Sequence, residues 1–418
     1  MEIARDFYLR ELILRKHNGS VKVVTGIRRV GKSYLLFEQF TRHLKESGTD
    51  DAHIIQIALD DPEHAEYCKP ITLLQHLKSL IHDENMYYIL LDEVQLLDNF
   101  EGVLNSLLRL RNVDIYVTGS NSKFLSKDIL TEFRGRGDEV HLYPLSFREF
   151  MSVYPHDRYA GWEEYITYGG LPGVVLRPTP QQKMLYLKNL FSETYLKDVI
   201  TRNHIRNTFE LETLLDILSS SVGSLTNPER IMKTFQSVEK TSLSKITIKS
   251  YIDALEDAFL IACAKRYDVR GRKYIGSPQK YYFEDVGLRN ARLNFRQMEK
   301  TYLMENVIYN ELRSRGYAVD VGVVEKRERN ESGVCVRKYF EIDFVVNQGS
   351  KRYYIQSAFA IPDEEKYRQE QKSLVLTGDS FKKIVIVKDP VVPLYDDNGI
   401  LTMNIFDFLM DADSLEKI

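Results

Sequence analysis

The chain has 418 residues, which is more than one hydrophobic core usually holds, so we expect two to four domains. Hydrophobic residues make up 43% and charged residues 28%, a balance that excludes a disordered or fibrous protein. The formal net charge is only −3, so any surface that binds nucleic acid has to be local.

The N-terminal sequence is charged throughout and lacks the apolar segment of a signal peptide, and no stretch is apolar enough to span a bilayer. Three cysteines, Cys68, Cys263 and Cys335, are far apart and lack zinc-binding or CxxC spacing. We therefore expect a cytoplasmic protein with no membrane partner, no disulfide and no zinc site.

The hydrophobic pattern changes character along the chain. Residues 21–146 alternate short β-rich runs with amphipathic stretches, which predicts a parallel sheet covered by helices. Residues 147–210 are mainly helical and are expected to form a small lid. Between 211 and 285, three helical segments precede two β-rich runs, a pattern typical of a winged helix. Residues 300–418 open with a helix and continue with strands, so we expect a separate α/β domain there.

A nucleotide-binding motif follows the first β-rich run. The sequence GIRRVGKS fits G-x-x-x-x-G-K-[ST], with an apolar strand before it and a helix after it, a context that disfavours a chance turn. In such a loop, backbone N–H groups and the helix N-terminus bind phosphate, the lysine reaches the β/γ oxygens and the serine hydroxyl binds Mg2+. The predicted ATP-binding residues are Gly26, Ile27, Arg28, Arg29, Val30, Gly31, Lys32 and Ser33.

Two adjacent carboxylates end the apolar run at 87–93. They are Asp92 and Glu93, and a buried parallel strand places them at the edge of the sheet where ligands bind. Asp92 would hold Mg2+ together with Ser33, and Glu93 would orient and deprotonate the attacking water. An isolated Asp-Glu pair could equally be a solvated turn, but beside the phosphate loop it predicts ATP hydrolysis.

Further polar residues follow the acidic strand. Ser120 and Asn121 end the next β-rich run and could hydrogen-bond the water or the γ-phosphate, or simply form a strand-ending turn. Arg134 and Arg136 are flanked by glycines and could neutralise charge on the γ-phosphoryl group, in cis or from a neighbouring subunit. They could also be surface arginines, because nothing local sets their direction.

Together these segments resemble the bacterial and archaeal AAA-type ATPases whose chains end in a DUF4143 domain. The resemblance covers essentially the whole chain and rests on GIRRVGKS, YYILLDEVQ, TGSNS, FRGRG, YPLSFREF and YGGLPGVV. A complete β-rich run, HIIQIALD, between the phosphate loop and the acidic strand, and a glutamate directly after Asp92, also resemble the additional-strand ATPases that include the AAA+ group. The resemblance implies that Pro172 packs near the adenine, although its Gly-x-Pro turn could merely connect two helices.

The resemblance implies a restriction-endonuclease-like fold for the last domain. That fold holds magnesium with a helix Glu, a strand Asp and a Glu-x-Lys on the next strand. Glu305 and Asp343 match the first two, but Gln356 and Ala358 stand in place of the carboxylate and the lysine. Because an amide is a poor magnesium ligand and alanine cannot activate water, we expect no nuclease activity.

The expected winged helix carries basic residues. Lys245 and Lys249 lie on its recognition-type helix, and Arg270, Arg272 and Lys273 lie on its wing, where they could bind phosphates of double-stranded DNA. Acidic residues on the same helix, and the packing role that winged helices have in other ATPases, leave DNA contact and a purely structural role both open.

The sequence thus predicts an α/β protein with a P-loop ATPase domain of the AAA+/additional-strand type at 1–150 and a helical lid at 151–210. A winged-helix-like segment at 211–295 and an inactive restriction-endonuclease-like domain at 296–418 follow. The expected function is Mg2+-dependent ATP hydrolysis coupled to conformational change of the C-terminal modules, with DNA, a protein or a second copy of the chain as partner. The alternative is a nucleotide-gated switch with little turnover, against which Glu93 argues. A GTPase is disfavoured because Asn-Lys-x-Asp is absent.

Overall fold

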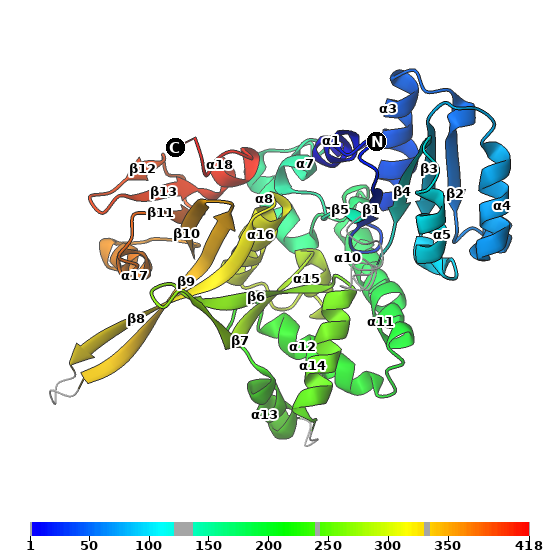
Figure 1. The fold of residues 1–418 in the computed structure, drawn as a ribbon. Helices are drawn as coiled ribbons and strands as arrows, with labels where there is room; N and C mark the ends of the chain where they lie inside the picture. The colour runs from blue at the N-terminus through cyan, green and yellow to red at the C-terminus, as the bar shows by residue number, and fades with distance from the viewer. Residues whose placement is uncertain (1, 121–136, 239–242, 330–334, 418) are drawn as a thin grey trace. The chain divides into compact units, whose positions relative to one another are not determined.

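The computed structural model describes residues 2–120, 137–238, 243–329 and 335–417. The chain forms two compact units (Figure 1). One comprises Met1–Pro144 with Asp257–Phe259, and the other comprises Leu145–Glu256 with Leu260–Ile418.

The first unit is built on a five-stranded parallel sheet in the order β2-β3-β4-β1-β5. Its strands are β1 (Val21–Thr25), β2 (Ile54–Ala58), β3 (Tyr87–Asp92), β4 (Val113–Thr118) and β5 (Gly137–His141). The central strands β1, β3 and β4 are almost entirely buried, which explains their mostly apolar sequences, and the charged residues Lys22 and Asp114 within them form a buried ion pair. The predicted parallel sheet is confirmed.

Helices flank this sheet. A continuous helix follows β1 and consists of α2 (Lys32–Tyr34), a π-helical turn (Leu35–Phe40) and α3 (Thr41–Glu46). The apolar sides of α4 and α5 pack against β3 in the core. The other helices of the unit are α1 (Asp6–Leu14), α4 (Pro70–Leu80) and α5 (Phe100–Leu107), with short 3-10 turns at Asp51–His53, Pro62–Cys68 and Val94–Leu96.

The second unit contains an eight-stranded mixed sheet in the order β12-β13-β11-β10-β9-β8-β6-β7. Helix α16 (Lys300–Ser314) precedes β8, and α17 (Glu364–Val375) connects β10 to β11. The α/β architecture expected for the C-terminal region is therefore confirmed. The strands are β6 (Ile261–Asp268), β7 (Lys273–Phe283), β8 (Ala318–Arg329), β9 (Cys335–Gln348), β10 (Lys351–Ala358), β11 (Lys382–Val387), β12 (Leu394–Tyr395) and β13 (Ile400–Asn404).

The hairpin of β6 and β7, predicted as the wing of a separate module, belongs to this larger sheet. Strand β6 pairs with β7 on one side and in parallel with β8 on the other. That pairing satisfies backbone groups that would otherwise form an open edge. The boundary predicted at 295/296 therefore falls between strands of one sheet. The three helices predicted before the hairpin are α12 (Thr208–Ser220), α13 (Pro228–Val238) and α14 (Lys245–Asp257).

The segment predicted as a lid is helical and starts the second unit. Trp162 of α8 is fully buried, with Phe147 of α7 and Phe406 of α18 packed edge-on against its ring. Within the described residues, no helix has both the length and the apolar sequence needed to cross a membrane. The remaining helices of the unit are α7 (Phe147–Met151), α8 (Arg158–Tyr168), α9 (Pro172–Val175), α10 (Pro180–Leu190), a π-helical turn (Phe191–Leu196), α11 (Lys197–Arg202), α15 (Val286–Arg292) and α18 (Ile405–Met410).

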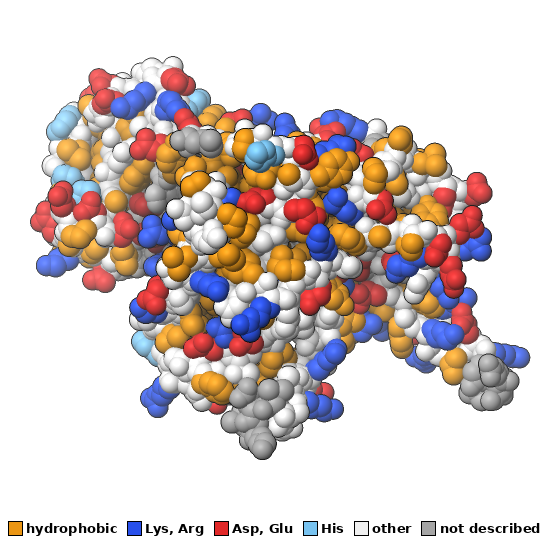
Figure 2. All heavy atoms as spheres, turned by 180° about the vertical axis from the view of Figure 1, so that it is seen from behind, with side chains coloured by type: hydrophobic (Ala, Val, Ile, Leu, Met, Phe, Trp, Pro, Cys, Tyr) orange, Lys and Arg blue, Asp and Glu red, His pale blue; other side chains and the backbone are white. Residues whose placement is uncertain are grey.

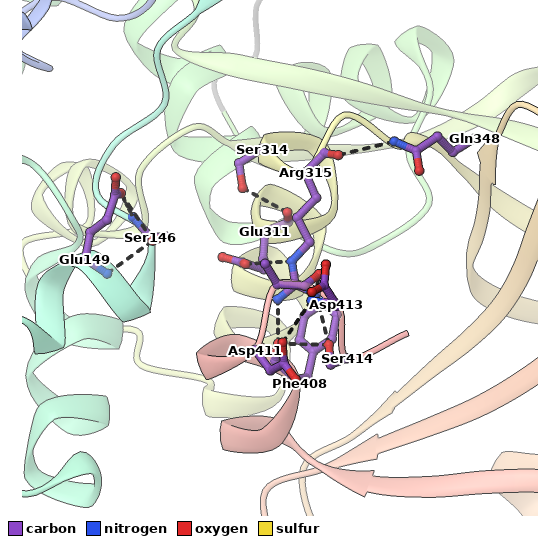
Figure 3. A network of polar contacts seen from close by, with 11 residues as sticks. Ser146, Glu149, Glu311, Ser314, Arg315, Gln348, Phe408, Asp411, Asp413 and Ser414 are labelled. Atoms are coloured by element: carbon purple, nitrogen blue, oxygen red, sulfur yellow. Dashed lines mark hydrogen bonds and ion pairs between the residues drawn. The ribbon is translucent and has the colours of Figure 1, made fainter. Parts of the chain in front are cut away.

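Arg315, directly after α16, ties this helix to the C-terminal segment (Figure 3). Its guanidinium contacts the Glu311 carboxylate at 2.8 Å, the Ser414 hydroxyl at 3.0 Å and the carbonyl oxygen of Phe408. Burial raises the pKa of Glu311, and the adjacent Arg315 opposes that shift. The network anchors α18 through groups that are largely out of water.

Candidate functional site

The predicted phosphate loop connects β1 to α2 and turns on glycines. Gly26 and Gly31 have φ of 136° and 102°, in the left-handed region that favours glycine. A Cβ at Gly26 would collide with the carbonyl oxygen of Leu142, so a larger residue does not fit there. The apolar members Ile27 and Val30 are fully buried and anchor the loop in the core.

Lys32 lies inside this loop. Its ammonium donates to the carbonyl oxygens of Gly26 at 3.0 Å and Ile27 at 3.2 Å, and the side chain is buried. The neighbouring Ser33 and Arg29 are exposed, whereas Arg28 is partly buried. The loop therefore places one positive charge at its centre.

Asp92 ends β3 and is buried next to two hydroxyl groups. The Thr118 hydroxyl donates to its carboxylate, and Ser33 lies close enough to affect its pKa. Burial raises the pKa of Asp92, and these two hydroxyl groups partly lower it again. Asp92 and Ser33, the two predicted magnesium ligands, thus lie near each other.

Thr118 is the residue of this site that the sequence interpretation missed. It ends β4, and β4 lies between β1 and β3 in the sheet. The β-rich run between the two motifs in sequence is β2, which lies on the far side of β3, so the strand inserted between them in space is β4. A threonine closing a β-rich run was the available signal.

Glu93 follows Asp92 with φ of 51°, in the left-handed region. Its backbone N–H donates to the Thr118 hydroxyl at 3.0 Å. Its carboxylate accepts hydrogen bonds from the Ser120 hydroxyl at 3.2 Å and from the Gln95 amide. Ser120 also accepts from Arg28 at 3.5 Å. The structure therefore brings Glu93, Ser120 and the phosphate loop together, while Asn121, Arg134 and Arg136 lie outside the described residues.

Pro172 begins α9 in the second unit, next to a turn built on Asp285. Gly169 has φ of 76°, and a Cβ there would collide with the Asp285 carboxylate. The backbone N–H groups of Gly170 and Leu288 donate to that carboxylate at 2.8 and 3.0 Å. Burial raises the pKa of Asp285 to about 6, against the lowering effect of these hydrogen bonds. These contacts with Asp285, within the second unit, explain why the turn contains glycine. A role of Pro172 at the adenine stays a prediction.

Comparison with known proteins shows the family to which this chain belongs. Residues 18–151 match the model of an AAA domain, and residues 159–299 match a domain of unknown function, DUF8612. An uncharacterized protein of Haemophilus influenzae is 33% identical over 391 residues, which is 92% of this chain and 93% of its own length. This chain belongs to that family of AAA-domain proteins. An uncharacterized protein of Methanocaldococcus jannaschii is 29% identical and matches over 88% of this chain and 82% of its own. The second domain model is DUF8612 rather than the predicted DUF4143, so that finer assignment is not confirmed.

Solved structures with a related arrangement include Aeropyrum pernix Orc1 in complex with DNA. It shares 13% identity, covers 70% of this chain and 92% of its own, and has a TM-score of 0.28. Cdc6p from Pyrobaculum aerophilum shares 10% identity over 72% of this chain and 94% of its own, with a TM-score of 0.30. At these values the likeness is limited, and no functional conclusion follows from it.

The second unit contains a buried charge cluster at the predicted nuclease position. Lys280 of β7 lies between three carboxylates, with its ammonium 2.8 Å from Glu305 of α16, 2.7 Å from Glu341 and 3.5 Å from Asp343 of β9. The Lys280 side chain is 3% exposed. Lys280 was not among the predicted residues, because it comes from a segment that carries no motif.

Gln356 and Ala358 lie on the neighbouring strand β10, as predicted, and bring no further charge. Gln356 accepts from the backbone N–H of Asp343 at 3.4 Å and donates to Glu370 at 3.3 Å, while Ala358 is buried. Across the described ranges, no group of three or more acidic, histidine or cysteine side chains is arranged to hold a metal ion. These residues do not fit a nuclease metal centre, because the Lys280 ammonium lies between the carboxylates where a metal ion would bind.

The protonation of this cluster follows from its charge balance. Burial lowers the pKa of Lys280, but the attraction of Glu305, Asp343 and Glu341 outweighs it, so the net shift is upward. Burial raises the pKa of Glu305 to about 7, with Lys280 opposing the shift. Three acids around one ammonium leave excess negative charge, which holds protons on both groups.

Two of the basic residues predicted to contact DNA are engaged within the unit. Arg270 donates to the carbonyl oxygens of Leu376 at 3.0 Å and Glu325 at 3.5 Å, and Lys245 forms an ion pair with Glu229. The other three are exposed, and they are Lys249, Arg272 and Lys273.

Proposed function

We propose that this protein binds Mg-ATP at Gly26–Ser33 and hydrolyses it, with Glu93 as the residue that orients and deprotonates water. The observation that carries the proposal is that the Thr118 hydroxyl links Asp92 and Glu93 at the carboxyl ends of the neighbouring parallel strands β3 and β4, with Ser33 of the phosphate loop near Asp92. Ligands of open parallel sheets bind at that edge.

The roles follow from the chemistry of each group. Lys32 would exchange its two loop carbonyls for phosphate oxygens, which bear more charge and attract an ammonium more strongly. Ser33 and Asp92, a hydroxyl beside a carboxylate, fit the oxygen ligands that Mg2+ prefers, and the bound ion would neutralise phosphate charge. The Thr118 hydroxyl, which donates to Asp92, holds this carboxylate in place.

Thr118 couples the metal-binding carboxylate to the catalytic one. Its hydroxyl donates to Asp92 and accepts from the Glu93 N–H, so the two acidic residues are held in a fixed relation. Ser120 and Gln95 direct the Glu93 carboxylate through two further hydrogen bonds. Positioning of this kind supplies most of the catalysis in phosphoryl transfer.

A pair of variants tests binding and turnover separately. Lys32→Ala should abolish ATP binding, measured by calorimetric titration, because the phosphate charge is no longer balanced. Glu93→Gln should bind ATP normally and release no phosphate above background, because an amide cannot accept the proton of water. Wild-type turnover in Glu93→Gln would remove the proposal. Wild-type chains that bind ATP but turn over no faster than Glu93→Gln would establish the nucleotide-gated switch instead.

We also propose that Arg134 or Arg136 supplies charge to the transition state. Loss of the active one should lower turnover by roughly a thousandfold with little change in ATP affinity. If it acts on a neighbouring subunit, mixing arginine-deficient chains with Glu93→Gln chains should restore partial activity, and sizing chromatography with ATP should show an oligomer. Normal turnover in both single variants would exclude this role.

We further propose that hydrolysis is coupled to a conformational change of the C-terminal unit. The protein would be cytoplasmic and would act on DNA or on a protein. This coupling predicts that hydrogen exchange of the second unit differs between ATP-bound Glu93→Gln and the ADP-bound protein. Identical exchange in the two states would separate the ATPase from any action of the second unit.

A further inference from the structure

The outer parts of β8 and β9 form a two-stranded ribbon that pairs with no other described strand. Strand β6 pairs with β8 only at 321–323, and β10 pairs with β9 only from Phe344 onward. Residues 325–329 and 335–339 pair with each other alone, and Figure 1 shows them extending past the rest of their sheet. We call these two segments the ribbon.

The ribbon carries five basic and only two acidic side chains, on a chain whose net charge is −3. Its register sets Lys326 directly opposite Lys338, and Arg327 directly opposite Arg337. Like charges in such cross-strand pairs repel and destabilise a hairpin. Each of these two pairs shares a single carboxylate, so the ribbon keeps an excess of positive charge that an anionic partner would compensate. Basic side chains along this part of the molecule are visible in Figure 2.

One face of the ribbon is rich in arginine. Because side chains alternate along a strand, Arg327 and Arg329 share a face with Arg337 and with Tyr339. Arg327 and Arg337 are 67% and 60% exposed, and Tyr339 is also exposed. Glu325 is shared by Arg327 at 3.3 Å and Arg337 at 3.6 Å, so one carboxylate meets two guanidiniums and the face stays positive.

The opposite face repeats the arrangement with lysines. Glu328 is shared by Lys326 at 2.8 Å and Lys338 at 2.9 Å. These two hydrogen bonds lower the pKa of Glu328 to about 2, so the carboxylate is ionised and still outnumbered. Both faces of the ribbon are thus net positive.

We propose that this ribbon binds double-stranded DNA, with Arg327, Arg329 and Arg337 on phosphates or base edges. The major groove of B-DNA is about 12 Å wide and admits a two-stranded ribbon, whereas the major groove of duplex RNA is too narrow for side chains to read. Arginine is the side chain whose planar fork matches both phosphate and guanine. The inference is independent of the ATPase, since it uses no residue of the nucleotide site.

The size of the effect follows from counterion release. Each phosphate contact contributes a slope of about −0.9 to log affinity against log salt, so three contacts give roughly −3. The double variant Arg327→Ala/Arg337→Ala should flatten the slope by about 2 and weaken binding on the order of 50-fold near 0.1 M salt.

The test is a fluorescence anisotropy titration of the full-length chain with a labelled duplex of about 20 base pairs, at several salt concentrations from about 50 mM upward. The matched control is Arg368→Ala/Lys417→Ala, which removes two exposed positive charges elsewhere in the same unit. A second comparison, Arg270→Ala/Arg272→Ala, probes the hairpin predicted from sequence. Thermal unfolding checks that each variant is folded.

We expect the ribbon variant alone to lose affinity and slope, with ATP turnover unchanged. Absence of binding by the wild type at low salt would overturn the proposal, as would an equal loss in the matched control, which indicates unspecific charge attraction. A loss confined to Arg270→Ala/Arg272→Ala would assign DNA to the hairpin of β6 and β7. Equal affinity for duplex RNA would contradict insertion into the major groove.

Discussion

Replacing Lys280 tests the buried charge cluster of the second unit. Lys280→Met keeps most of the apolar stem and removes the ammonium that Glu305, Glu341 and Asp343 share. The three carboxylates then face one another without their cation. We expect the free energy of unfolding to fall, by an amount set by how deeply each acid is buried.

The magnitude can be worked from the exposures. Glu305 and Asp343 are 7% and 9% exposed, so water screens them little, whereas Glu341 is 35% exposed and contributes less. Removing one partner of a buried ion pair costs about 3–5 kcal/mol. We expect a loss in that range for the ionised cluster.

The loss should depend on pH. The pKa of Glu305 is raised from 4.5 to about 7 in the wild type, and loss of Lys280 raises it further. Above about pH 7 the wild-type folded state has released the Glu305 proton, whereas the Lys280→Met folded state still holds it, so the stability of the variant keeps falling with pH where that of the wild type levels off. The destabilisation of Lys280→Met should therefore be smallest near about pH 5 and largest near about pH 8.

Urea unfolding followed by fluorescence is the assay. The chain has one tryptophan, Trp162, which is buried in the second unit and reports on that unit. Lys300→Met is the matched control, because Lys300 forms an exposed ion pair with Glu163 and its loss should cost less than about 1 kcal/mol. The double variant Lys280→Met/Glu305→Gln should recover part of the stability.

Divalent cations provide a further readout. Carboxylate oxygens are preferred ligands of Mg2+ and Ca2+, so these ions should restore part of the stability of Lys280→Met and leave the wild type unchanged. Wild-type stability of Lys280→Met near about pH 8, or a difference independent of pH, would refute the account of the cluster.

Three further predictions concern single contacts. Thr118→Val removes the hydroxyl between Asp92 and Glu93 and should lower ATP turnover by about 10- to 100-fold with little change in ATP affinity; unchanged phosphate release would contradict it. The pKa of Asp285 rises from 3.8 to about 6, so its protonation favours the folded state and stability should fall by about 3 kcal/mol as pH rises across that interval. Asp285→Asn should flatten this pH dependence, and an unchanged profile would show that other groups cause it. Arg315→Ala leaves the buried carboxylate it contacts unpaired, so we expect a loss of about 3–5 kcal/mol and faster hydrogen exchange in α18; slow exchange there would exclude the anchoring role.

The nucleotide motif and the parallel sheet could be predicted from sequence because their signals are local. The phosphate loop occupies eight consecutive residues, with an apolar strand before it and a helix after it. Strands buried on both faces need mostly apolar sequences, which marked β1, β3 and β4 despite the paired Lys22 and Asp114. The expectation that the last domain has no nuclease activity came from two residue types, Gln356 and Ala358, and it stays a prediction.

The features that only the tertiary structure decided bring together segments that are far apart in the chain. Lys280 of β7 contacts Glu305 of α16 and Asp343 of β9, and the residues next to Lys280 in sequence give no sign of a charge cluster. The order of strands placed Thr118 between the phosphate loop and Asp92, and joined β6 to β8 instead of leaving a separate wing. Hydrophobic periodicity shows that a strand is buried but does not specify its neighbours, because backbone hydrogen bonds between strands are the same for every sequence. Neighbours are selected by packing and by charge pairing in three dimensions, and the contacts of this site and of the buried cluster arise at that level.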